Sequence, residues 1–230
     1  MTAEVEEKLR EWAEKYNDPA YFEEDPISFP REFLRRGASL RDIETAAVFA
    51  AHFAWGRRSM IVRDCERLFD EMEWKPYGYI EAQDYRSDDS SIHRTVKWSE
   101  VASICRNLHS WYSAHDSLES LSPSEFRTLI YDGKPDPKAP NKKINMLRRW
   151  MVRRDGKVDL GLWKSSDPAE LIIPLDVHVH DVSRELGLTE RKSKDIATAL
   201  EITDHFRTIF PGDPAKGDFA LFGYGLTQGR

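Results

Sequence analysis

Ile172-Ile173-Pro174-Leu175-Asp176-Val177-His178-Val179-His180 is the run from which this chain is best interpreted, and it continues to Gly187. Pro174 lacks a backbone donor and biases Ile173 away from helical dihedral angles, which predicts a rigid, apolar approach to a helix. Asp176 is a preferred N-cap residue, and Gly187 is a preferred residue just past a helix end. The run therefore predicts a helix over residues 176–186 that opens with a carboxylate, which the helix dipole keeps ionised. This carboxylate is either a helix cap alone or a functional group as well.

A second run, Asn141-Lys142-Lys143-Ile144-Asn145-Met146-Leu147, follows Pro140. Its apolar residues recur at helical spacing, which predicts a helix over residues 141–153. A lysine in the first helical turn meets the positive end of the dipole, which disfavours its charged form. Because only a neutral amine attacks an electrophile, Lys142 or Lys143 is a candidate nucleophile. The alternative is that both lysines are solvated surface residues.

Together, the two runs resemble segments of the helix-hairpin-helix/Gly-Pro-Asp superfamily of DNA glycosylases. Pro174 to Val179 is similar to the Pro-Val-Asp-x-x-Val signature of that superfamily, and the run at Lys142 is similar to the segment that carries its lysine. Nearly the whole chain resembles, more closely, a bacterial family classed as a domain of unknown function. The features shared with that family are Asp25-Pro26, Ala54-Trp55-Gly56, Arg149 to Arg153, Val158 to Trp163, the run at Asp176, and Asp218 to Gly223.

The superfamily resemblance implies an all-α fold of two packed lobes in one domain over residues 1–230, with a helix-hairpin-helix-like region at about 122–153. It implies an N-glycosylase, with AP-lyase activity, that removes a damaged base from double-stranded DNA, and an oxidised purine such as 8-oxoguanine is favoured. Lys142 would attack the sugar C1′, while Asp176 would balance the positive charge that develops on the sugar. Lys142 is preferred because it precedes the polar Asn145 by three positions, and Lys143 is the alternative nucleophile.

The resemblance also implies residues that contact the DNA. In 8-oxoguanine glycosylases, a polar residue and an aromatic residue four positions apart read and stack the flipped base, which implies this role for Asp218 and Phe222. A side chain at the turn after residue 54 would fill the gap left by the base, and Trp55 stands there. The structural alternatives are a cap at Asp218 and core packing at Phe222 and Trp55. The full set of DNA-binding candidates is Trp55, Arg57, Arg58, Asn145 and Arg148.

Asp132 to Pro140 departs most from the superfamily pattern. It stands where a Gly-x-Gly hairpin would grip a DNA phosphate through backbone N–H groups, but it contains one glycine and three prolines. Prolines remove backbone donors, so we expect a modified helix-hairpin-helix. The 33 residues from 143 to 175 that separate Lys142 from Asp176 are more than many members have. A similar insertion and an unusual hairpin occur in the archaeal 8-oxoguanine glycosylases, to which the resemblance is therefore closest.

Composition excludes several other kinds of site. Two cysteines, Cys65 and Cys105, predict no disulfide framework and no iron–sulfur cluster, and no Cys/His spacing predicts a metal or another cofactor. The formal charge of −6 disfavours a protein that covers nucleic acid non-specifically with its whole surface. The acidic N-terminal segment is unlike a signal peptide, and no apolar run reaches membrane length. We expect a cytoplasmic monomer without a membrane partner.

Two functions from other classes stay open. A nucleic-acid-binding module without catalysis is favoured by the altered hairpin, and a glycosidic-bond enzyme acting on nucleosides is favoured by the acidic charge.

Hydrophobic periodicity predicts helices along almost the whole chain. The predicted helices span residues 2–16, 27–36, 40–54, 57–73, 98–114, 122–131, 141–153, 177–186, 192–209 and 215–224. Residues 86–94 are predicted to be a loop.

Overall fold

The computed structural model describes residues 2–228, which divide into two compact units. Of the described residues, unit 1 holds 2–21 and 136–228, and unit 2 holds 22–135. Helices dominate both units, and the strands within the described part of the chain are one short antiparallel pair. The all-α prediction is therefore confirmed.

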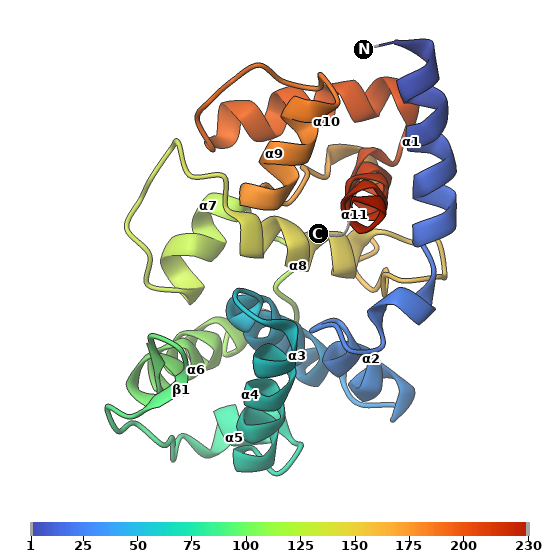
Figure 1. The fold of residues 1–230 in the computed structure, drawn as a ribbon. Coiled ribbons are helices and arrows are strands. Elements are labelled where there is room, and N and C mark those ends of the chain that lie inside the picture. Colours follow the sequence, from blue (N-terminus) through green and yellow to red (C-terminus); the bar gives the residue numbers. More distant parts are fainter. Residues whose placement is uncertain (1, 229–230) are drawn as a thin grey trace. The chain divides into compact units, whose positions relative to one another are not determined.

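Unit 2 is built around α3, whose residues from Ile43 to Phe53 are all buried. The side chain of Ser39 begins this helix by accepting a hydrogen bond of 3.1 Å from the Asp42 N–H. Most of this buried stretch consists of small and aromatic apolar residues, and the buried Glu44 and His52 have polar partners in Tyr112 and Glu100, so α3 lies at the centre of the core of unit 2. Figure 1 shows the unit in blue to green. Its elements are α2 (Ser28–Arg35), α3 (Leu40–Phe53), α4 (Arg58–Glu71), α5 (Pro76–Ala82), β1 (Ser91–His93), β2 (Val96–Lys97), α6 (Trp98–Tyr112) and α7 (Pro123–Glu125), which continues as a π-helical turn over Phe126–Ile130.

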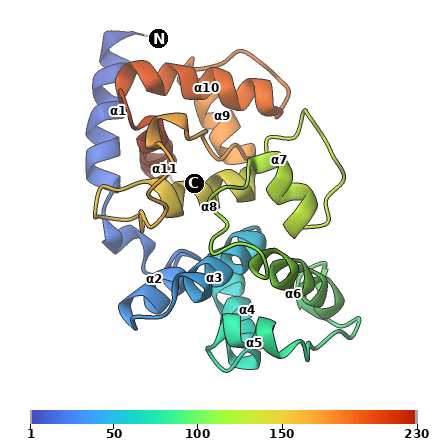
Figure 2. The ribbon, with the colours of Figure 1, turned by 180° about the vertical axis from the view of Figure 1, so that it is seen from behind.

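Unit 1 places α1 along α11, and both views of the ribbon show these two helices side by side (Figure 1, Figure 2). Gly223 permits this contact, since a Cβ at that position would lie 2.0 Å from Cδ2 of the Tyr16 ring. Trp12 and Tyr224 add an edge-to-face contact with ring centroids 5.3 Å apart. The helices of unit 1 are α1 (Ala3–Tyr16), α8 (Lys142–Val152), α9 (Val177–Glu185), α10 (Ile196–Ile209) and α11 (Gly217–Thr227), with 3₁₀ turns at Pro168–Glu170 and Pro214–Lys216. A further 3₁₀ turn, Pro19–Phe22, spans the unit boundary.

Three sequence predictions need correction. Residues 86–94 are not a loop throughout, because Ser91–His93 pairs with Val96–Lys97. The short helix α5 was not predicted, since seven residues carry too little periodicity. The helix predicted from residue 192 begins at Ile196, because the Asp195 carboxylate accepts a hydrogen bond of 3.0 Å from the Thr198 N–H and caps the helix there.

None of the helices in residues 2–228 combines the length and the apolar character needed to cross a bilayer.

Candidate functional site

Lys142 is the first residue of α8, as predicted. Asn141 takes left-handed dihedral angles with φ at +48°, so the chain turns sharply after Pro140. The Asn145 side-chain amide donates a 2.9 Å hydrogen bond to the Pro140 carbonyl and closes the turn from inside the helix. The Lys142 side chain is 27% exposed. The turn thus brings a lysine to the start of a helix while leaving part of its side chain open to solvent.

Asp176 is the N-cap of α9, which confirms the cap predicted from the sequence. Its Oδ1 accepts a hydrogen bond of 2.9 Å from the Val179 N–H. The approach to it is buried, with Ile173 fully covered and Leu175 2% exposed. The Ile173 N–H donates to Thr203 Oγ1 of α10, which fixes the path of the chain before the cap. The carboxylate is therefore held in place by its own helix and by a rigid segment before it.

The two residues form an ion pair. Lys142 Nζ lies 3.9 Å from Oδ2 of Asp176, the oxygen that does not cap the helix. This distance exceeds that of a hydrogen bond, so the contact is one of charge. The Asp176 side chain is 42% exposed. Both groups belong to unit 1 and are accessible from solvent.

Asp218, in the first turn of α11, is bound by an arginine of α8. Arg149 Nη1 donates a short hydrogen bond to Asp218 Oδ2, and Arg149 Nε donates one of 3.2 Å to Asp159 Oδ1. Burial raises the pKa of the Asp218 carboxyl, and the Arg149 guanidinium opposes that rise. The Asp176 carboxylate also raises the Asp218 pKa, and the Lys142 ammonium lowers it. Asp218 therefore lies within the electrostatic reach of the Lys142–Asp176 pair.

Phe222 follows Asp218 by one helical turn and lies half-buried in a group of three aromatic rings. Its ring centroid is 6.1 Å from that of Tyr16 and 6.4 Å from that of Tyr21, both in edge-on geometry. The two tyrosines are not among the site residues expected from the sequence. No local pattern marks them, because they lie some two hundred residues earlier in the chain.

The remaining candidates of unit 1 differ in exposure. Asn145 is buried, with 3% of its surface exposed, and its amide is committed to the turn at Pro140. Lys143 and Arg148 are half-buried. Of the two lysines, it is Lys142 that forms the ion pair with Asp176. Asn145 thus lies inside the turn at Pro140, whereas Lys143 and Arg148 are partly open to solvent.

Trp55, Arg57 and Arg58 belong to unit 2. The alternative of a buried core tryptophan does not hold, because Trp55 is 39% exposed. The Trp55 carbonyl oxygen anchors the turn that follows α3, because it lies 3.0 Å from Nε2 of the buried His93. The Arg94 guanidinium stands over the indole at 4.5 Å from the ring centroid. Arg57 is the N-cap residue of α4, and it and Arg58 are exposed, so an aromatic face and several cations share this turn.

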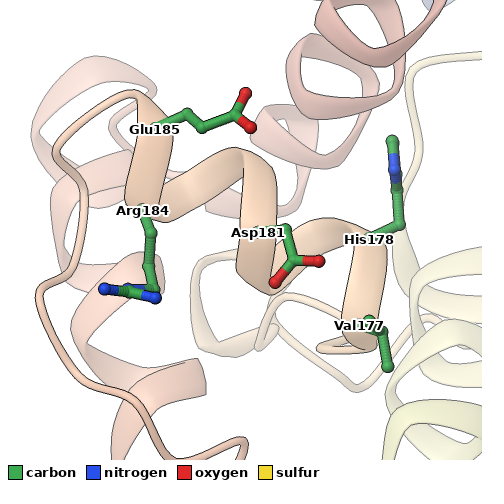
Figure 3. Close-up of a pocket in the computed structure, with 5 residues that line it drawn as sticks. All are labelled: Val177, His178, Asp181, Arg184 and Glu185. Atoms are coloured by element: carbon green, nitrogen blue, oxygen red, sulfur yellow. The ribbon is translucent and has the colours of Figure 1, made fainter.

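A pocket of about 720 Å³ lies along α9, beginning one residue after Asp176. Its size is within the range of small-molecule sites. Figure 3 shows Val177 and Arg184 pointing to one side of the helix, and His178 and Glu185 to the other. The lining contains two carboxylates, those of Asp181 and Glu185, and one guanidinium, that of Arg184. This excess of negative charge disfavours the binding of a phosphate group. Within residues 2–228, no group of His, Cys, Asp and Glu side chains is placed to hold a metal ion.

Residues 25–132 and 122–227 match the model of a family described as a protein of unknown function, DUF2400. The chain belongs to the DUF2400 family. Searches of curated proteins and of solved structures each found no match. The match confirms the resemblance to a domain-of-unknown-function family, while the relation of DUF2400 to the DNA glycosylases stays a prediction. The matched ranges include every candidate site residue from Trp55 to Phe222.

Proposed function

We propose that this DUF2400 protein is a DNA N-glycosylase with AP-lyase activity, acting on double-stranded DNA through a lysine imine. An oxidised purine such as 8-oxoguanine is the favoured lesion. The observation that supports the proposal is the ion pair between Lys142 Nζ and Asp176 Oδ2, 3.9 Å apart and open to solvent. A nucleophilic amine and a carboxylate at this separation can act on one sugar with little adjustment.

The chemistry begins with a base that is rotated out of the duplex. The bond between C1′ and the base nitrogen breaks, and its electron pair leaves with the base. Asp176 Oδ2 balances the positive charge that develops on the sugar, because the other oxygen of this carboxylate is already committed to the α9 cap. The Lys142 ammonium first gives up a proton to water with the help of the Asp176 carboxylate, and the neutral amine then forms a bond to C1′ while the departing base nitrogen takes up a proton from water. Opening of the sugar ring yields the imine, which acidifies C2′ and allows β-elimination of the 3′ phosphate.

Asp218 and Phe222 are the residues proposed to face the base. They lie four positions apart on α11 and hence on one side of the helix. The Arg149 hydrogen bond engages Asp218 Oδ2, so Oδ1 is the oxygen proposed to accept from the base. The Phe222 ring would stack on the flipped base. Trp55, Arg57, Arg58, Asn145 and Arg148 are proposed to contact the DNA around the lesion.

The decisive experiment is reductive trapping. Borohydride reduces an imine to a stable amine, so the protein mixed with an 8-oxoguanine duplex and borohydride should become covalently attached to the DNA. Lys142→Gln should abolish the adduct while keeping DNA binding, which fluorescence anisotropy measures. Lys143→Gln is the matched control, since it removes the neighbouring lysine, and it should still trap.

Two outcomes would count against this assignment. Trapping that persists in Lys142→Gln but is lost in Lys143→Gln would move the nucleophile by one residue. If folded protein traps no oxidised, alkylated or deaminated base, the glycosylase proposal fails, and a non-catalytic nucleic-acid module or a nucleoside enzyme is favoured.

A further inference from the structure

Two neighbouring residues of the β1–β2 hairpin hold the turn at Trp55 through different contacts. His93, the last residue of β1, is fully buried and has Nε2 3.0 Å from the Trp55 carbonyl oxygen. Arg94, the next residue, is exposed and places its guanidinium 4.5 Å from the centroid of the indole. A Cβ on Gly56, where φ is +105°, would lie 2.8 Å from Arg94 Nη1. Glycine at residue 56 therefore leaves the space in which the arginine side chain lies.

His93 is in turn held by a buried carboxylate. Its Nδ1 lies 2.8 Å from Asp64 Oδ2, and Asp64 is 1% exposed. The Phe53 ring stacks on the imidazole, with centroids 5.2 Å apart. Burying a carboxylate and an imidazole costs desolvation free energy, which an apolar pair of similar size would not incur. The contacts from Asp64 through His93 to the Trp55 carbonyl are therefore explained better by the positioning of Trp55 than by the stability of unit 2.

The exposed side of this turn is both aromatic and cationic. Trp55 is 39% exposed, and Arg57 and Arg94 are exposed as well. The Asp64 carboxylate does not cancel their charge, because it is buried and already pairs with Arg63 Nη2 at 2.8 Å. An indole beside exposed guanidinium groups fits a nucleic-acid strand, in which a base offers a ring for stacking and the neighbouring phosphate offers a negative charge.

We propose that Arg94 contacts the DNA together with Trp55. The indole stacks on an unpaired base, and the guanidinium binds the phosphate next to that base. His93 and Asp64 are positioning residues, which act through the Trp55 carbonyl. This inference rests on the proposed function in that the bound strand is DNA, but no step of base removal enters it.

Arg94→Ala tests the phosphate contact, and Arg36→Ala is its matched control. The Arg36 guanidinium also lies over an indole, 4.6 Å from the Trp74 ring centroid, but that ring packs against Phe33 and Phe69. Binding to an 8-oxoguanine duplex is followed by fluorescence anisotropy at several salt concentrations. Arg94→Ala should weaken binding roughly tenfold, and the slope of log K against log salt should fall by about one, as for one lost phosphate contact. Arg36→Ala should leave both quantities unchanged.

Arg94→Lys separates the charge from the planar guanidinium. Lysine keeps the positive charge, so the salt slope should stay near that of the parent protein. A salt slope as low as that of Arg94→Ala would contradict a contact made through charge. Affinity and slope that are unchanged in Arg94→Ala would overturn the proposal.

The positioning role is tested by a double-mutant cycle. His93→Leu should weaken duplex binding in the parent protein but have no further effect in Trp55→Ala, because His93 acts through that residue. His93→Gln keeps an N–H donor for the Trp55 carbonyl and should retain most of the affinity. Equal losses in both backgrounds would overturn the positioning role. If thermal unfolding shows that His93→Leu does not fold, Asp64→Asn, which keeps the shape of its side chain, replaces it in the cycle.

Borohydride trapping with the same variants separates this inference from the glycosylase proposal. If Arg94→Ala binds more weakly with a lower salt slope but the parent protein traps nothing, the DNA contact is kept and the glycosylase is rejected. Trapping by the parent protein, with affinity and slope unchanged in Arg94→Ala, would keep the glycosylase and reject the contact. A parent protein that binds neither lesion-bearing nor undamaged duplex would reject both.

Discussion

The imidazole of His178 lies close to Gly225 with its Cε1–Nε2 edge, so that a Cβ on residue 225 would lie 2.5 Å from each of these two ring atoms. His178 is the second residue of α9, two positions after Asp176, and Gly225 is near the end of α11. The absence of a side chain at residue 225 thus determines how closely the start of α9 approaches α11.

Gly225→Ala should therefore disturb the site more than the fold. The added methyl group pushes His178 away and moves the first turn of α9, which carries Asp176. A misplacement of about 1 Å can cost roughly 10²-fold in rate, and we expect a loss of that order in imine trapping. His178→Ala makes room for the methyl group, so Gly225→Ala should have little further effect in that background. Equal losses in both backgrounds would contradict this explanation.

Substitutions at Asp176 should separate its capping role from its charge. Asparagine is as good an N-cap as aspartate, so Asp176→Asn should leave the free energy of unfolding nearly unchanged in urea denaturation. Asp176→Ala should lower it by about 0.5–2 kcal/mol. Both variants lack the carboxylate that balances the developing sugar charge, and both should trap DNA more slowly by orders of magnitude. An Asp176→Asn protein as active as the parent would reduce this residue to a cap.

Trp55 and Trp74 provide a matched comparison within unit 2. Each indole has a guanidinium above it, Arg94 at 4.5 Å over Trp55 and Arg36 at 4.6 Å over Trp74. Trp74 is also enclosed by aromatic rings, with Phe33 at 5.6 Å, and its Nε1 donates to Asp70. Trp55 is 39% exposed.

If Trp55 contacts DNA, Trp55→Ala should weaken lesion-duplex binding by roughly 1–3 kcal/mol, the usual value of base–aromatic stacking, and leave stability nearly intact. Trp74→Ala should instead lower stability by roughly 2–4 kcal/mol. Anisotropy titrations and urea unfolding measure the two quantities. Unchanged DNA affinity in Trp55→Ala would remove that residue from the proposed interface.

The two thiols of unit 2 should make stability depend on alkaline pH. Burial raises the pKa of Cys105 from an ordinary value of 9.0 to about 12, and burial raises that of Cys65 well above its ordinary value. Unfolded thiols ionise near pH 9 while the buried ones stay protonated, so the free energy of unfolding should fall as the pH rises from about 9 towards 12. In Cys105→Ala, the free energy of unfolding should fall less steeply over this pH range. The tyrosines contribute equally to the variant and the parent protein, so the comparison cancels their contribution. Native protein that reacts rapidly with a thiol reagent at pH 8 would contradict the burial of both groups.

The parts of the site that could be predicted from sequence are those that obey local rules. The cap at Asp176 and the helix start at Lys142 depend on residues within four positions of each. The pairing of Arg149 with Asp218 spans 69 positions and depends on tertiary packing of α8 against α11. The hairpin at Ser91–His93 and the short α5 were missed because so few residues carry no clear periodicity. The start of α10 was misplaced because a cap at Asp195 prevailed over the polar residues before it, which were compatible with a helix.

The order of synthesis has a consequence for unit 1, which joins residues 2–21 to 136–228 around a continuous unit 2. Unit 2 leaves the ribosome as one stretch and can begin to fold while the rest is being made. The aromatic face of α1, with Trp12 and Tyr16, has its partners Tyr224 and Gly223 on α11, which is translated some two hundred codons later. Throughout that interval Trp12 and Tyr16 of α1 stand without their partners on α11, so this contact of unit 1 cannot form until α11 has been made.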